Sequence, residues 1–239
     1  FYHNLRYRRY LVGYKRGKYN FTDILSLNKM GWMVGLQMGL ETALFSITGI
    51  MIGWLGSIAL AAHQVMVAIS TLGFMIYYGV GAAVSVRVSN YFGRQELLHV
   101  RRTTMAGFHL ILCLAVCACT VFLFSRELIG YLFTTSEEVI RVVSTLVYIL
   151  LAYQFGDALQ ITYANSLRGI GDVISMAVIS FIGYFLIAMP VCYICGFVLE
   201  WDITGIWIGY PIGLTLTGVM LCGRYYWKLK TKTQSKEFY

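Results

Sequence analysis

The sequence predicts an all-α membrane protein with six transmembrane helices, and three observations support this fold class. Hydrophobic residues make up 58% of the 239 residues and charged residues only 13%, whereas a soluble domain carries about 25% charged residues. The mean hydropathy is +0.67. Apolar runs recur that, at about 1.5 Å per residue, are long enough to cross a hydrocarbon core of roughly 30 Å.

The signs of the charges alternate along the chain. All but two of the 19 lysines and arginines fall in four places, which are the stretch through Lys29, the segment 87–102, Arg168 and the tail from Arg224 to Lys236. The exceptions, Arg126 and Arg141, stand among acids. Because cytoplasmic loops carry the basic excess, this pattern predicts that both termini are cytoplasmic and that the number of spans is even. The net charge of +8 is then explained by topology and anionic lipid, without nucleic acid.

The pattern divides the chain into three parts. Residues 1–28 form a basic, aromatic cytoplasmic segment, 29–223 the membrane bundle, and 224–239 a basic cytoplasmic tail. The first part has no initiator methionine and no signal-peptide pattern. We expect it to follow a preceding helix that is absent from this chain, so that the sequence is a fragment; an interfacial amphipathic segment is the alternative. The six spans are predicted at about residues 30–53, 64–85, 105–124, 142–166, 173–199 and 203–222.

Local signals predict the first two spans and the connections that follow them. The first span places Gln37, Glu41, Phe45 and Thr48 on one helix face. A short turn at 57–62 is predicted to lead into the second span, which is rich in glycine and serine near its end. The longest polar loop is expected at 87–104.

The last three spans carry clearer signals. Ser136 in the connector 126–141 resembles the start of the helix of span four. Pro190 is expected to bend span five. In span six, small residues recur at every fourth position and predict a close-packing face, formed by Gly205, Gly209, Gly213 and Thr217.

Two carboxylates interrupt apolar runs. Glu41 is the only charged residue between Met30 and Met51, and Asp157 is the only other acid inside a long apolar segment. Glu41 lies about 18 Å along its helix from Lys29, and Asp157 about 16 Å from Arg168. The two acids are therefore expected at one depth near the membrane midplane.

Carboxylates at this depth are costly and usually functional. One interpretation is a cation or proton site. The other is that each carboxyl stays protonated and bonds a neighbouring hydroxyl or carbonyl. Tyr153, Asp157 and Gln160 share one face of span four, which favours the first interpretation, although a polar patch that joins helices would give the same stripe.

The other polar and sulfur groups give weaker signals. The six cysteines lie in or beside apolar runs without His or Cys partners at metal spacing, so no metal site beyond a bound sodium ion and no cofactor is predicted. His63 and His109 are expected near opposite faces of the membrane, which disfavours a membrane-embedded enzyme such as an acyltransferase.

Five motifs follow one another along the chain. They are Gly35-Leu-Gln-Met-Gly-Leu-Glu41-Thr-Ala-Leu-Phe45, Leu60-Ala-Ala-His63-Gln64, Val86-Arg-Val-Ser-Asn-Tyr-Phe-Gly93, Tyr153-Gln-Phe-Gly-Asp157-Ala-Leu-Gln160, and Leu167-Arg168-Gly169 with Asp172. In this order they resemble the C-terminal half of a MATE (multidrug and toxic compound extrusion) transporter of the NorM-like bacterial type. The resemblance starts near residue 24 and covers nearly the whole remaining chain.

The resemblance implies one six-helix lobe of a two-lobe, twelve-helix transporter in the bacterial cytoplasmic membrane. It implies export of organic cations and drugs in exchange for Na⁺ or H⁺, with Glu41 and Asp157 as cation-binding carboxylates and Tyr153 beside them. Gln37, Gln160 and Arg168 are expected to support this site. One departure is visible: Met33 stands where the family often has a proline, which leaves the bend of this helix open.

Two alternatives remain beside the antiporter. A flippase for lipid-linked precursors with a related two-lobe fold would have a cavity lined by several arginines and lysines, and the spans contain essentially none. A lobe fragment without activity of its own is the other alternative, because one lobe cannot form a cleft between two. The sequence does not distinguish Na⁺ from H⁺ coupling, and it does not identify the exported compound or the oligomeric state.

Overall fold

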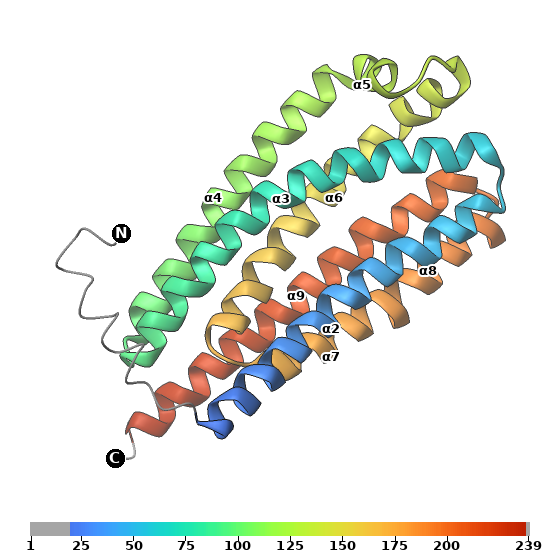
Figure 1. Ribbon diagram of the computed structural model, residues 1–239. Coiled ribbons are helices and arrows are strands. Elements are labelled where there is room, and N and C mark those ends of the chain that lie inside the picture. Colours follow the sequence, from blue (N-terminus) through green and yellow to red (C-terminus); the bar gives the residue numbers. More distant parts are fainter. Residues whose placement is uncertain (1–19, 238–239) are drawn as a thin grey trace.

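The structure is a computed structural model that describes residues 20–237, and every regular element in this range is helical. Figure 1 shows the helices side by side in one elongated bundle. The elements are α2 (Phe21–Gly53), α3 (Ser57–Gly93), α4 (Leu97–Phe124), α5 (Arg126–Phe133), α6 (Glu137–Gly169), α7 (Val173–Phe181), η2 (Ile182–Ala188), α8 (Met189–Tyr193), η3 (Ile194–Val198) and α9 (Asp202–Glu237).

Six of the helical segments in this range are long and apolar enough to cross a membrane, with α7 through η3 counting as one segment, Val173–Val198. The prediction of an all-α membrane protein with six spans is confirmed. The predicted start of a helix after Ser136 is also confirmed, because α6 begins at Glu137.

The helices extend further than predicted and the connections are shorter. Residues 57–62 are part of α3, and only three residues, Arg94 to Glu96, lie outside helices in the expected loop 87–104. The reason is that hydropathy marks only the apolar part of a helix, whereas the i→i−4 hydrogen bonds continue into the polar ends. The tight turns use left-handed backbone at Gly56 (φ 114°) and Gln95 (φ 61°).

The expected boundaries at 28/29 and 223/224 fall inside helices. The helix α2 starts at Phe21, and the Oδ1 atom of Asn20 accepts a hydrogen bond from the Thr22 backbone N–H at 3.2 Å, as an N-cap residue does. The helix α9 continues to Glu237. Residues 1–19 of the expected basic segment lie outside the described residues, and the predicted compartments stay predictions.

The helix α6 occupies the centre of the bundle. It packs against α3, α4 and α9. In the most apolar 18-residue stretch of α6, 50% is buried inside the bundle, compared with 17% in the corresponding stretch of α4. Figure 1 shows the start of α2, the α3–α4 turn, the α6–α7 turn and the end of α9 at one end of the bundle. Because α6 is packed on several sides, its polar side chains from Gln154 to Ser166 are buried between its neighbours.

Small residues let α9 approach the fifth span closely, as the four-residue spacing predicts. A Cβ atom at Gly205 would lie 2.2 Å from the backbone oxygen of Cys195, and one at Gly209 would lie 2.2 Å from the Cys192 sulfur. Real Cβ contacts essentially never fall below 3.0 Å. The backbones of the two antiparallel segments are therefore in direct contact.

The fifth span departs from α-helical geometry on both sides of Pro190. Wider π-helical turns span Ile182–Ala188 and Ile194–Val198, and the short α8 with its proline lies between them. A proline removes one hydrogen-bond donor and crowds the carbonyl one turn earlier, so neighbouring turns relax. The sequence predicted a bend at Pro190, and the structure shows π-helical turns on both sides of it, with Tyr184 in the first of them.

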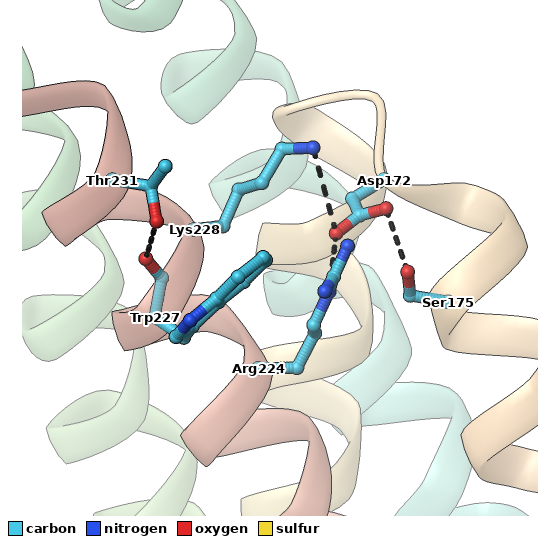
Figure 2. A network of polar contacts seen from close by, with 6 residues as sticks. All are labelled: Asp172, Ser175, Arg224, Trp227, Lys228 and Thr231. Carbon is cyan, nitrogen blue, oxygen red and sulfur yellow. Dashed lines mark hydrogen bonds and ion pairs between the residues drawn. The ribbon is translucent and has the colours of Figure 1, made fainter. Parts of the chain in front are cut away.

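An ion-pair network joins the start of α7 to the end of α9 (Figure 2). The Arg224 Nε atom donates to Asp172 at 2.7 Å, the Ser175 hydroxyl donates to the other Asp172 oxygen at 2.8 Å, and Lys228 Nζ lies 4.0 Å away. The Arg224 guanidinium also covers the Trp227 ring, with 4.5 Å to its centroid. Burial alone would raise the pKa of Asp172, but these hydrogen bonds and positive charges outweigh it and lower the pKa below its ordinary value.

We expect Asp172→Asn to lower the thermal midpoint of the purified protein by about 2 to 6 °C, since a charge-assisted hydrogen bond is worth about 1.5 kcal/mol. A carboxyl with a lowered folded-state pKa stabilises the fold above its unfolded pKa and loses this contribution as the pH falls through the folded pKa. The difference between wild type and variant should therefore be constant from pH 5 to pH 8. Thermal midpoints measured in detergent across this range test the expectation, and a difference that grows toward pH 8 would contradict it.

Candidate site with two carboxylates

Glu41 on α2 is the centre of a polar cluster inside the bundle. Its Oε2 atom accepts hydrogen bonds from Gln37 Nε2 at 3.3 Å, Gln160 Nε2 at 3.4 Å and the Tyr184 hydroxyl at 3.3 Å. Gln37 lies one turn earlier on α2, Gln160 comes from α6 and Tyr184 from η2. Three segments distant in sequence thus converge on one carboxylate, and the Gln160 amide and Tyr184 hydroxyl also contact each other.

Asp157 lies on α6 between Tyr153 and Gln160, on the face turned toward Glu41. Asp157 is completely buried and Tyr153 is 2% exposed. Neither carboxylate oxygen of Asp157 has a hydrogen-bond partner within residues 20–237. Asp157 and Glu41 interact electrostatically. A buried carboxylate without a donor is costly unless a positive charge or a proton neutralises it.

Arg168 extends the cluster toward the end of α6. Its guanidinium donates to Gln37 Oε1 at 3.4 Å, Asn165 Oδ1 at 3.2 Å and the Tyr78 hydroxyl at 3.2 Å. Gln37 therefore connects Arg168 to Glu41, because it accepts from one and donates to the other. The structure brings together all six residues predicted from the sequence: Gln37, Glu41, Tyr153, Asp157, Gln160 and Arg168.

Glu41 borders two spaces of different size. On the side of Arg168, a cavity of about 20 Å³ is lined by Gln37, Tyr78 and Asn165 among others, which is room for one water-sized particle. On the other side, a hollow of about 280 Å³ between α2 and α3 reaches Tyr153, close to the size range of small-molecule sites. The residues that line this hollow are mostly apolar or hydroxyl-bearing: Met38, Thr42, Phe45, Val67, Ser70, Thr71, Phe74 and Met75.

Sequence reasoning missed Tyr184 and Tyr78 as members of the cluster. Each is a tyrosine within a long apolar run, and the chain holds 18 tyrosines, so residue type alone selects neither. The sequence offers no signal that separates these two tyrosines from the others.

His63 and His109, the two histidines near the ends of predicted spans, lie away from the carboxylates. His63 is 2% exposed and its ring contacts Trp207 edge-on at 5.8 Å, and His109 lies beside Phe108. Neither lines the two spaces that Glu41 borders. No group of three or more His, Cys, Asp or Glu side chains in the described part of the chain could hold a metal ion.

The MatE family profile matches residues 34–194, a range that contains both carboxylates, Tyr153 and Arg168. The chain belongs to the MATE family. Its resemblance to a MATE transporter, first drawn from five motifs, is confirmed.

Similar MATE proteins include the multidrug resistance protein NorM of Photobacterium profundum, which is 34% identical over 220 residues, covering 90% of this chain and 47% of NorM. NorM of Vibrio cholerae is 32% identical over 214 residues, covering 87% of this chain and 47% of that protein. The chain spans about half the length of the curated relatives it matches.

Solved MATE structures share the fold. The match to the eukaryotic transporter AtDTX14 has a TM-score of 0.80 at 20% identity. It covers 91% of this chain and 51% of the AtDTX14 chain. The Vibrio cholerae MATE transporter VcmN in its bent form gives a TM-score of 0.82 at 15% identity, covering 90% of this chain and 49% of its own. The six-helix bundle therefore matches about half the length of these MATE structures.

Proposed function

We propose that this MATE chain is the C-terminal half of a cation-coupled antiporter that exports organic cations, including drugs, across a bacterial cytoplasmic membrane. The coupling ion is Na⁺ or H⁺, and both ends of the chain lie in the cytoplasm. The names of the bacterial relatives, multidrug resistance proteins NorM, support multidrug export. The N-terminal six-helix lobe is the expected partner, since the chain covers 47% of these relatives.

The observation that carries the proposal is the position of Glu41 between two spaces, near Asp157, whose carboxylate has no hydrogen-bond partner among the described residues. A coupling ion or proton can neutralise Glu41 from the small cavity, and a cationic substrate can approach the same charge from the hollow that reaches Tyr153. Two nearby carboxylates repel each other, so one binds a proton or both share a cation.

Exchange follows if the coupling ion and the substrate compete for this negative charge. A ligand shifts a conformational equilibrium only by as much as its affinity differs between the two states. Neutralisation of Glu41 and Asp157 by the coupling ion would lower the affinity for a cationic substrate in one state. Alternating access would then arise from movement of one repeat or lobe against the other around the site.

The spaces contain little positive charge, which argues against a flippase for lipid-linked phosphate precursors. In the described chain, Arg168 is the one basic side chain that lines either space bordered by Glu41, and its guanidinium is bonded to Gln37, Asn165 and Tyr78. A diphosphate group would need several free cationic donors. The observed arrangement favours cationic substrates.

Efflux of a fluorescent cationic dye from proteoliposomes tests the proposal. The vesicles would hold the full-length protein, with an inward Na⁺ gradient and an inward H⁺ gradient imposed separately. We expect one gradient to accelerate dye efflux and thereby to identify the coupling ion. Equal efflux with and without either gradient, over a panel of flat and of aliphatic cations, would refute the antiporter.

A further inference from the structure

A groove between α3 and α4 lies apart from the carboxylate site. It encloses about 400 Å³ and is lined at one end by Arg87 and Arg102, and along its length by Val80, Ala83, Ala106 and Leu110 among others. We propose that this groove binds one anionic phospholipid, with its phosphate between the two guanidiniums and an acyl chain along the apolar walls.

The two arginines lie at matching depth. Arg87 precedes the end of α3 at Gly93 by about 9 Å of helix, and Arg102 follows the start of α4 at Leu97 by about 8 Å. Both are exposed, and neither makes a hydrogen bond, ion pair or ring contact with another described residue. Within residues 20–237, four of the six other arginines are engaged: Arg101 covers Tyr226, and Arg126, Arg168 and Arg224 have polar partners.

The remainder of the groove suits an acyl chain. Val80 lies about 10 Å along α3 from Arg87, and Leu110 lies about 12 Å along α4 from Arg102, both in the direction away from the α3–α4 turn. The floor is tight, because a Cβ atom at Gly107 would lie 2.3 Å from Val84 Cγ2. The charged end and the apolar length thus follow the head-to-tail order of a phospholipid.

The position of α4 in the bundle favours lipid as the occupant. Only 17% of the most apolar 18-residue stretch of α4 is buried, the lowest share among the six candidate spans. Figure 1 shows α4 at one edge of the bundle. The paired guanidiniums match a phosphate in charge and in hydrogen-bond geometry. Basic residues near the membrane surface attract anionic lipids at about 1 kcal/mol each, roughly a fivefold factor in affinity.

Native mass spectrometry of the full-length protein tests the site, with dioleoylphosphatidylglycerol as the probe and dioleoylphosphatidylcholine as the zwitterionic reference. We expect one saturable phosphatidylglycerol site, weakened about 25-fold by the double variant Arg87→Gln/Arg102→Gln. The matched control is Arg94→Gln/Arg141→Gln, which removes the same charge from two exposed arginines outside the groove and should change the affinity less than about twofold.

A second variant separates a lipid from a simple anion. Ala106 is exposed in the groove, so Ala106→Phe fills the apolar part and leaves both arginines in place. We expect it to lose phosphatidylglycerol binding by at least about fivefold and to keep the gel-filtration profile of the wild type. Four outcomes would each overturn the proposal. They are unchanged lipid binding in Ala106→Phe, displacement of the lipid by millimolar inorganic phosphate, an equal loss of binding in the control pair, and the absence of a saturable site in the wild type.

Discussion

Replacement of Asp157 by asparagine is expected to abolish gradient-driven efflux by the full-length protein. Asp157 is completely buried and its carboxylate has no hydrogen-bond partner within the described residues, so its charge is available to a coupling ion or a proton. An uncompensated charge near the bilayer centre costs roughly 2.5 to 3.5 kcal/mol. A coupling ion that neutralises Asp157 relieves this cost, so the variant should bind the ion about 100-fold more weakly and lose coupled transport accordingly. Dye efflux from proteoliposomes under the coupling gradient measures it.

The control for this variant is Asp202→Asn, the same change at an exposed position between η3 and the body of α9. Asp202 has a left-handed backbone with φ 48°, which asparagine tolerates. We expect wild-type coupling from Asp202→Asn and wild-type membrane abundance from both variants. Undiminished coupled efflux by Asp157→Asn would remove this carboxylate from the proposed site and leave Glu41 to be tested alone.

Replacement of Gly205 by alanine is expected to destabilise the contact between α9 and the fifth span. The added Cβ atom would lie 2.2 Å from the Cys195 backbone oxygen and 2.8 Å from the Gly196 backbone nitrogen. Because these are backbone atoms, the two helices must separate, and such overpacking costs about 1 to 3 kcal/mol. We expect the thermal midpoint of the protein in detergent to fall by about 4 to 10 °C.

The control is Gly223→Ala, which makes the same substitution further along α9. A Cβ atom at Gly223 would meet nothing within 4 Å, and alanine is about 1 kcal/mol more favourable than glycine inside a helix. The midpoint should therefore stay constant or rise. If Gly205→Ala were as stable as Gly223→Ala, the close packing of α9 against the fifth span would be wrong.

The fold class and most residues of the candidate site could be predicted from the sequence alone. Six apolar runs separated by charges of alternating sign were sufficient to predict six membrane helices, since a span must bury its backbone hydrogen bonds in lipid. Isolated polar residues in such runs are costly, which is why Glu41 and Asp157 could be selected without a structure. Helical spacing placed Tyr153 and Gln160 on the same face as Asp157, and the structure agrees.

The tertiary structure alone decided which helices meet and where the helices end. Tyr184 reaches Glu41, and Arg168 reaches Gln37, across contacts between α2 and segments far along the chain. Helical periodicity fixes the face of a residue but carries no information about the neighbouring helix, which depends on the packing of all six spans. The groove between α3 and α4 has the same origin, because Arg87 and Arg102 come together only when the two helices pack side by side.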